Sequence, residues 1–498
     1  MGIEVKPSLD DFLSLAKKGN LVPLWRELLA DTETPISAYL KVRDGGFSYL
    51  LESAEKSEKI GRCSFIGYRP FLVVRFQDQQ AEIRQGNRRD ILKGVEDPVS
   101  VLRPLKEKYV LVTHDDLPPF QGGLVGFINY DLVRKWERLP GIGPKEKAVP
   151  EAVFIGTRRM IIFDHQTHKL RIVVFVHVEK NDDLRRCYEE AYGELEETTS
   201  QVLRPLSTMD IDDSASLSEL RPNMSREEYE SAVHRAKEYI AAGDAIQIVL
   251  SQEFSGDLSG DPFTLYRNLR SINPSPYMFY LDFEEVKFVG ASPEVLVRLI
   301  DGRIELIPIA GTRPRGENDE EDRALEEDLI SDPKERAEHI MLVDLGRNDV
   351  GKVAMPGSVK VTRLMEVERF SHVMHIVSHI EGLLRSDMDC FDLFVSAFPA
   401  GTVAGAPKIR AMEIINELEP SQRGAYAGAV GYFGFNGNMD FCITIRTMTI
   451  VNGRLSLQVG AGIVADSSPE REYEETMKKA AAMFKAIREI NTNDPRNR

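Results

Sequence analysis

The sequence predicts a mixed α/β (α+β) fold in which large β-sheets are covered by helices. Several β-rich runs lie in the N-terminal part, the clearest being Phe71 to Phe76, Val153 to Phe163 and Leu170 to Val178. The later part mixes strands and helices without the regular spacing of strand–helix–strand units. Because 498 residues exceed one ordinary core, we expect two or more domains or one large multilayer fold.

Composition divides the chain into three regions. Residues 1–206 form a strand-rich N-terminal region, and residues 207–222 are polar and rich in Ser, Asp and Pro, which is typical of a linker. Residues 223–498 open with Ser225-Arg226-Glu227-Glu228. This pattern resembles a capping box and predicts a helix that runs to about Ala242.

Charge and cysteine content narrow the class of protein. The formal net charge of −16 disfavours nucleic-acid and anionic-lipid partners, because a negative surface repels phosphate. No uncharged apolar run reaches membrane-spanning length and the first residues lack a signal-peptide pattern, so we expect no membrane partner and a cytoplasmic location. The four cysteines show neither zinc-ligand nor C-x-x-C spacing, and reduced thiols are expected.

Two expected helices each carry a Glu-x-x-Glu pair. The first begins at Asp332, which can be the N-cap, with Pro333 at the first helical position and the pair Glu335 and Glu338 in the opening turns. Glu335 can equally be a capping-box residue, since acids near a helix N-terminus are ordinary. By itself, this pair is therefore only weak evidence for a metal site.

The second pair, Glu472 and Glu475, shares one stripe of the C-terminal helix with Lys479. This stripe is either a solvated face with a weak Glu–Lys pair or the wall of a cavity. In a cavity wall the carboxylates would hold a hard cation such as Mg²⁺, and the ammonium would bind an anionic substrate. Helical periodicity does not show whether the two Glu pairs face each other.

Glycine-containing segments and histidines add further candidates. The turn within Pro308 to Gly316 can present N–H groups and a hydroxyl to a carboxylate, or can be a simple tight turn. Gly460-Ala461-Gly462 ends a strand where small residues let a ligand approach the backbone. His372, His375 and His379 have helix-like spacing without an H-E-x-x-H context, so one histidine in proton transfer is favoured over zinc.

Several separate segments together resemble the chorismate-utilising enzymes, and the match covers nearly all of residues 223–490. These segments are Gly290-Ala291-Ser292-Pro293-Glu294, Pro308 to Gly316, Asp332 to Asp349, Thr402 to Lys408 and Glu472 to Ala480. The resemblance implies the fold of that family, which is a large multilayer arrangement of antiparallel-rich β-sheets covered by helices. The region from residue 223 would then be the chorismate-binding catalytic core.

The resemblance also implies a role for each site residue. Mg²⁺ would be the cofactor, with Glu338 and Glu475 as direct ligands and Glu335 and Glu472 close by through water. The residues surrounding chorismate would be Gly311, Thr312, Tyr426, Arg446, Gly460, Ala461, Gly462 and Lys479. The residues implied in catalysis would be Gln247, Glu294, His375 and Thr402. Chorismate carries two carboxylates, which suits a metal ion and the fork-shaped Arg446, and Glu294 needs a raised pKa to help the ring hydroxyl depart.

Two uncharged positions indicate which branch of the family the chain resembles. Relatives that add water have a lysine base at the position of Gln247, and aminodeoxychorismate synthases typically have a lysine at the position of Ala310. The chain therefore resembles the large subunits of anthranilate synthase, which implies formation of anthranilate and pyruvate from chorismate and ammonia, the first step of tryptophan biosynthesis. The alternatives are an aminodeoxychorismate synthase and a catalytically inactive tryptophan-sensing module.

The N-terminal region resembles the regulatory half of the same enzymes. Leu50 to Ser53 and Gly61 to Gly67 carry this likeness together with Asn273 to Phe279, although alone they are a strand end and a turn. The implied inhibitor is tryptophan, held by Ser53, Pro276, Tyr277 and Met278. No cysteine lies in a Gly-x-Cys-x-Gly elbow, so ammonia would come from a separate glutamine amidotransferase subunit. The resemblance implies a heterotetramer with two copies of each chain.

Overall fold

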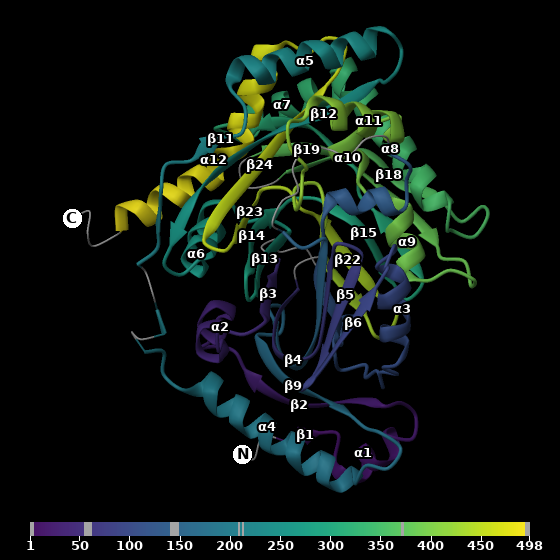
Figure 1. Cartoon of the computed structure of the whole chain (residues 1–498), viewed down its shortest axis with the longest axis vertical. Helices are drawn as coiled ribbons and strands as arrows, with labels where there is room; N and C mark the ends of the chain where they lie inside the picture. The colour runs from purple at the N-terminus through teal and green to yellow at the C-terminus, as the bar shows by residue number, and fades with distance from the viewer. Residues whose placement is uncertain are drawn as a thin grey trace.

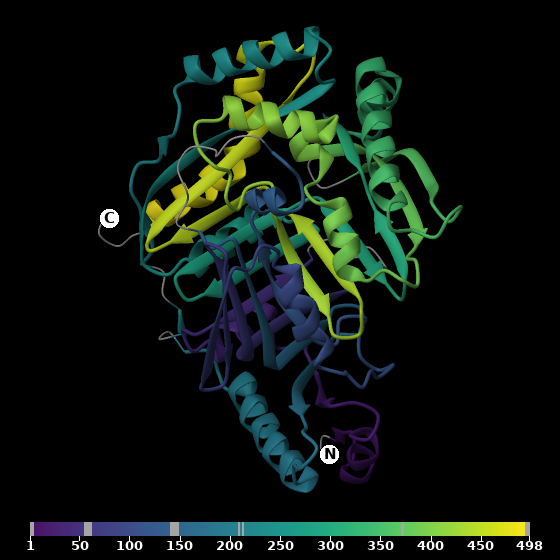
Figure 2. The ribbon, with the colours of Figure 1, turned by 45° about the vertical axis from the view of Figure 1, so that its right-hand side comes forward.

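The computed structural model describes residues 4–53, 62–139, 149–207, 210–211, 214–369 and 373–493 (Figures 1 and 2). Its strands form one continuous hydrogen-bonded network, and the named strands pair antiparallel with one another. Helices cover this network, so the predicted mixed fold with large antiparallel-rich sheets is confirmed. His372 and parts of the predicted linker lie outside the described residues.

The first branch of the network extends from the N-terminus to the longest strand of the C-terminal part. In order of pairing it contains β1 (Val5–Lys6), β2 (Leu21–Leu29), β9 (Lys169–His177), β8 (Ala152–Asp164), β4 (Cys63–Gln77), β3 (Ser48–Glu52), β13 (Tyr277–Phe283), β14 (Val286–Ser292), β23 (Thr447–Val451), β24 (Arg454–Ile463) and β12 (Gln247–Ser259). Short strands that also pair with β12 are β10 (Ser216–Leu217), β11 (Arg221–Pro222) and β20 (Gly405–Ala406).

The second branch shares β4 and β8 with the first. In order of pairing it contains β6 (Arg88–Lys93), β5 (Gln80–Gln85), β4, β8, β7 (Gly123–Ile128), β21 (Ala429–Gly434), β22 (Met439–Ile443), β15 (Val295–Ile300), β16 (Arg303–Leu306) and β19 (Val373–Leu383). Beside β19 lie β17 (Ile309–Pro314) and β18 (Lys360–Arg369).

The two branches diverge where the shared strands change partners. Residues 65–68 of β4 pair with β3 on one side and with the second half of β8 on the other. Residues 72–77 pair instead with β5, and residues 72–76 with the first half of β8. An irregularity between Pro70 and Leu72 marks the change of register. A β-bulge bends a strand and increases its twist, which lets one strand serve two sheets.

Two connections pass between the branches and carry predicted site residues. Glu294 lies between β14 of the first branch and β15 of the second, and Arg446 lies between β22 of the second and β23 of the first. The Ile443 N–H donates to the Glu294 carbonyl at 3.0 Å, and the Ala291 N–H donates to the Arg446 carbonyl at 3.1 Å. Each connection is therefore hydrogen-bonded to a strand that flanks the other one.

Helices pack on the outer faces of the sheets, as Figure 1 shows for α4 beside β9 and for α12 beside β24. The helices of the described residues are α1 (Leu9–Leu15), α2 (Pro35–Val42), α3 (Val99–Glu107), η1 (Tyr130–Lys135), α4 (Leu184–Leu203), α5 (Arg226–Ala241), α6 (Phe263–Ile272), α7 (Asp319–Ser331), α8 (Pro333–Gly351), α9 (Cys390–Ala397), α10 (Gly401–Ala404), α11 (Lys408–Leu418) and α12 (Pro469–Asn493). Across the described part of the chain, no helix has the length and apolar character needed to cross a membrane.

Local sequence signals match the observed elements. Ser225 caps α5 through the predicted capping box with Glu228, and Asp332 caps α8 with Pro333 in the first turn. Residues 1–206 and 223–498 are joined by strand pairing, because β3 pairs with β13 and β7 pairs with β21. Between them, β10 and β11 bind part of the predicted linker to β12.

Candidate active site and a second cavity

The first Glu pair lies at the start of α8 beside β17. Asp332 accepts hydrogen bonds from the N–H groups of Lys334 and Glu335, but the Glu335 side chain does not complete a capping box. Its carboxylate accepts from Arg313 at 3.3 Å, and the same guanidinium binds Asp332 at 3.1 Å. Burial, together with the nearby charge of Glu338, raises the pKa of Glu335 although Arg313 opposes this shift.

Glu338 binds the side chain of Gln247 at the start of β12. Gln247 is 3% exposed, and its Nε2 donates to Glu338 Oε1 at 2.7 Å. Its Oε1 is buried and has no hydrogen-bond partner among the described residues. On the neighbouring strand β24, a Cβ added to Gly462 would lie 2.7 Å from Gln247 Nε2. The absence of a side chain at Gly462 therefore makes room for the amide.

The second Glu pair lies on α12, whose side chains face β24. Lys479 Nζ donates to the Gly460 carbonyl at 3.1 Å and lies 3.8 Å from Glu475. A Cβ added to Gly460 would lie 2.5 Å from the Tyr426 hydroxyl, so the phenol packs against this glycine. Gly460 is therefore in contact with both the Lys479 ammonium and the Tyr426 phenol.

Glu294 and Arg446 form the centre of this region. Burial raises the pKa of Glu294 to about 7, although Thr402, Arg446 and Lys479 each lower it. Thr402 Oγ1 is buried without a partner at hydrogen-bond geometry within the described chain. Arg446 adopts a positive φ of 49°, a strained backbone conformation for a residue with a side chain, and its guanidinium interacts electrostatically with Glu294 and Glu475.

His375 lies on β19 opposite Gly311 and Thr312 of β17, so the tight turn considered for this segment is instead a strand, with an irregularity of register between Ala310 and Thr312. Its Nδ1 is 2.9 Å from the Gly311 carbonyl and 3.0 Å from Thr312 Oγ1. Because a carbonyl can only accept, Nδ1 carries the proton and Nε2 is the basic nitrogen. Burial and the charge of Arg446 lower the pKa of His375, so the ring is neutral near pH 7. The helix-like histidine spacing is misleading, because His375 and His379 lie on a strand.

These contacts place several of the predicted site residues in two groups, which adjoin across the paired strands β12 and β24. Glu335 is linked to Glu338 and Glu338 to Gln247, while Arg446 interacts with Glu475 and Glu294. Within the described residues, however, no three His, Cys, Asp or Glu side chains lie close enough together to hold a metal ion. The donor set still suits Mg²⁺, because it consists of carboxylates and a cation would offset both the burial and the repulsion from Glu338 that raise the pKa of Glu335.

The four residues predicted to bind the inhibitor lie elsewhere, around a cavity of about 580 Å³ between the two branches. Ser53, Pro276, Tyr277 and Met278 all line it, together with apolar side chains that include Phe65. Ser53 Oγ is buried and has no hydrogen-bond partner in the described part of the chain. The structure therefore brings together two sequence segments that are more than 200 residues apart.

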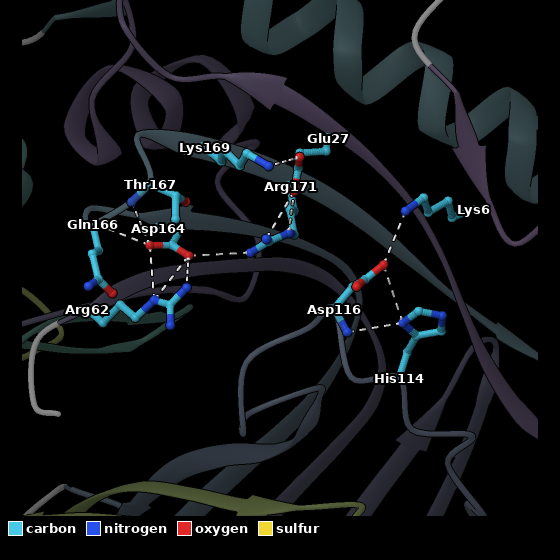
Figure 3. Close-up of polar contacts among 10 residues, drawn as sticks. All are labelled: Lys6, Glu27, Arg62, His114, Asp116, Asp164, Gln166, Thr167, Lys169 and Arg171. Atoms are coloured by element: carbon cyan, nitrogen blue, oxygen red, sulfur yellow. Dashed lines mark hydrogen bonds and ion pairs between the residues drawn. The ribbon is translucent and has the colours of Figure 1, made fainter. Parts of the chain in front are cut away.

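Charged side chains line one part of this cavity, as the contacts in Figure 3 show. Arg62 donates to Asp164 through Nε at 3.1 Å and Nη2 at 2.6 Å, and Arg171 lies 3.8 Å from the same carboxylate. The pKa of Asp164 falls to about 2, against the effect of burial, because Arg62 and the Thr167 N–H stabilise the charged form. Lys6 pairs with Asp116 at 3.1 Å on another lining segment (Figure 3).

Sequence reasoning missed several residues that support the active site. Arg313 follows Thr312 on β17 and binds Glu335. Its only sequence signal is a basic residue directly after the Gly-Thr pair. His339 is buried and its Nε2 lies 2.6 Å from Ser378 Oγ; burial lowers its pKa to about 4. Arg423 is completely enclosed beside Tyr426, and nothing in its local sequence indicates this.

Comparison with known proteins agrees with this geometry. The family model described as chorismate binding enzyme matches residues 46–485. Anthranilate synthase component 1 of Acetivibrio thermocellus is 45% identical over 97% of this chain and 98% of its own length, and that of Aquifex aeolicus is 47% identical over 96% and 97%. Anthranilate synthase component I from Streptococcus pneumoniae superposes with a TM-score of 0.76 at 36% identity, covering 92% of this chain and 98% of that structure. MenF, the menaquinone-specific isochorismate synthase from Escherichia coli, shares the fold at 19% identity, with a TM-score of 0.69 over 96% of this chain and 98% of its own.

The chain belongs to the chorismate-binding enzymes, and it is an enzyme that acts on chorismate. Within that family it falls among the anthranilate synthase component 1 proteins, as the resemblance of its motifs predicted.

Proposed function

We propose that this chain converts chorismate and ammonia into anthranilate, pyruvate and water, with Mg²⁺ as cofactor and tryptophan as feedback inhibitor. The choice of ammonia rests on Gln247. Its Nε2 donates to Glu338, which leaves Oε1 as a buried acceptor pointing away from that carboxylate. A carbonyl oxygen can accept an N–H of ammonia, but it cannot remove a proton from water.

Glu294 is the proposed acid for the first step. A carboxyl with a pKa of about 7 is half protonated near neutral pH and can give a proton to the departing ring hydroxyl. The hydroxyl then leaves as water while the carbon–nitrogen bond forms. Arg446 interacts electrostatically with Glu294, and its planar fork suits a substrate carboxylate.

The metal would be held by α8 and α12. Glu338 and Glu475 are the proposed direct ligands, with Glu335 and Glu472 acting through water. When bound, Mg²⁺ supplies positive charge that neutralises a substrate carboxylate. Lys479, which lies 3.8 Å from Glu475 and bonds the Gly460 carbonyl, adds a second cation on the same wall.

His375 is the proposed base for the second step. Its neutral ring, with the proton on Nδ1, leaves Nε2 to accept a proton from the aminated intermediate. As the carbocyclic ring of the intermediate loses this proton, the carbon–oxygen bond to the enolpyruvyl group breaks. The released enolate takes up a proton to become pyruvate. Formation of the aromatic ring makes this step favourable. Thr402 lies beside Glu294, where it can assist placement of the substrate.

Tryptophan is the proposed occupant of the cavity between the branches. Apolar walls and paired charges in a space of about 580 Å³ suit an aromatic amino acid, and Ser53 Oγ offers a hydrogen-bonding group without a partner in the described chain. Because β3 and β13 both line the cavity and pair with each other, a bound ligand would favour one arrangement of these strands.

Ammonia is proposed to come from a separate glutamine amidotransferase subunit, in a complex with two copies of each chain. A cysteine-type glutaminase needs a thiol of lowered pKa. Here burial raises the pKa of all four cysteines, to about 11 for Cys63 and about 12 for Cys390. None of them has the thiolate character that glutamine hydrolysis requires, so free ammonia should work without the partner.

The proposed nucleophile is tested by Gln247→Lys, with the neighbouring exposed residue changed as a control in Ile246→Lys. Each protein receives chorismate, Mg²⁺ and ammonium, and anthranilate is followed by its fluorescence. Gln247→Lys should impair amination because its ammonium replaces the acceptor and pairs with Glu338, whereas Ile246→Lys should retain activity. Unchanged anthranilate formation by Gln247→Lys would count against ammonia as the nucleophile held at this residue.

A further inference from the structure

Arg423 is a buried cation that joins segments distant in sequence. It is 2% exposed and lies after α11, four residues beyond Glu419. Nε and Nη2 donate to the Glu419 carboxylate at 2.9 and 2.7 Å, which is the bidentate arrangement that only a guanidinium supplies. Nη1 donates to the Val403 carbonyl at 2.7 Å, and Nη2 also donates to the Val249 carbonyl at 2.6 Å.

Both carbonyl partners lie close in sequence to a residue of the candidate active site. Val403 follows Thr402 on α10, and Val249 lies two residues after Gln247, on the same face of β12. Glu419 strengthens the hold on β12, because it accepts from both the N–H and the hydroxyl of Ser251, at 2.8 and 2.7 Å. One buried ion pair therefore fixes α10 and β12 relative to each other.

The guanidinium also lies between two tyrosine rings. Its carbon is 4.8 Å from the ring centre of Tyr130 and 5.4 Å from that of Tyr426. Tyr426 reaches Gly460 of β24, and Tyr130 belongs to the N-terminal region, where its N–H donates to the Gly424 carbonyl at 2.8 Å. Both rings gain a favourable cation–π contact that holds them against Arg423.

We propose that Arg423 is a positioning residue that aligns Gln247, Thr402 and Tyr426 around chorismate, an inference that rests on the amination reaction proposed above. Lysine cannot replace it, because an ammonium lacks the planar fork needed to bind Glu419 and two carbonyls together. The Lys479 ammonium is held by the Gly460 carbonyl, and the Arg446 backbone by the Ala291 N–H, so substrate binding depends on Arg423 less than the chemical step does.

The test compares Arg423→Lys and Arg423→Met with Arg159→Met. Arg159 is a buried arginine of β8 in the N-terminal region, and it pairs with Glu194 and Glu197 of α4. Thermal unfolding and steady-state kinetics with chorismate, Mg²⁺ and ammonium are measured well below the unfolding temperature. We expect Arg423→Lys to be folded, with kcat at least tenfold lower and a KM for chorismate within about threefold of the parent value. Arg159→Met should lose stability and keep its kcat.

Two results would overturn this role. The first is a folded Arg423→Lys with kcat within twofold of the parent, and the second is loss of activity that only follows the loss of folded protein. If Arg423→Met does not fold, Arg423→Lys decides the question. Failure of the parent enzyme to form anthranilate would refute the proposed reaction instead, and the two failures are thus distinguished.

Discussion

Gly462→Ala is predicted to displace the amide of Gln247 without unfolding the enzyme. The added Cβ would lie 2.7 Å from Gln247 Nε2, and a contact of about 3.4 Å is needed, so the amide must retreat by roughly 0.7 Å or more. The hydrogen bond to Glu338, now 2.7 Å long, would be lost or distorted. A bond to a charged group contributes about 1.5–3 kcal/mol, which corresponds to roughly 10- to 150-fold in rate.

We therefore expect kcat/KM for ammonia to fall about 10- to 100-fold, because the nucleophile loses its fixed acceptor. Stability should change little, since the clash involves the end of a flexible side chain and Gly462 has no left-handed backbone. Initial rates of anthranilate fluorescence, measured against ammonium concentration, give kcat/KM for ammonia. Thermal unfolding gives the change in stability. Gly351→Ala is the control, because a Cβ there would meet nothing within 4 Å. A folded Gly462→Ala with unchanged kcat/KM for ammonia would refute the reasoning.

Three further predictions concern the acid, the metal and the inhibitor. Because the pKa of Glu294 is raised to about 7 and its protonated form is the active one, kcat/KM for chorismate should fall as pH rises above about 7, and Glu294→Gln should abolish this dependence along with most activity; a flat profile between pH 6 and 9 would contradict its role. Glu338→Gln and Glu475→Gln should each weaken calorimetric Mg²⁺ binding by about tenfold or more, since each removes a proposed ligand charge; unchanged affinity would exclude that residue as a ligand. Ser53→Phe should remove inhibition by tryptophan by filling part of the cavity that Ser53 lines, and retained inhibition would place the tryptophan site elsewhere.

Local elements of this fold follow from sequence because their signals are short-range. The capping residues Ser225 and Asp332 and the β-rich run beginning at Leu170 act through neighbours within a few positions, and the structure has the expected helices and strand. The two-branched network does not follow in this way. The change of partners along β4 and the pairing of β3 with β13 depend on contacts between residues far apart in the chain.

The same distinction between short-range signals and long-range contacts applies to the candidate site. The motifs predicted which side chains form the site. The hydrogen bond between Gln247 and Glu338, however, joins residues 91 positions apart, and no sequence periodicity predicts it. The spacing of His375 and His379 suggested a helix face, although bulges and pairing place them on a strand. The role of Arg423 was not predictable from the sequence, because its partners are backbone carbonyls and a carboxylate that only the folded chain brings together.

The most direct test of the account mixes the isolated chain with chorismate, Mg²⁺ and ammonium, with and without tryptophan. Anthranilate fluorescence and product mass are recorded, and pyruvate is measured in the same samples. The account predicts equal amounts of anthranilate and pyruvate, no product after chelation of the metal, and suppression by tryptophan. Accumulation of an aminated product without pyruvate would indicate an aminodeoxychorismate synthase, and absence of turnover would contradict the proposed reaction.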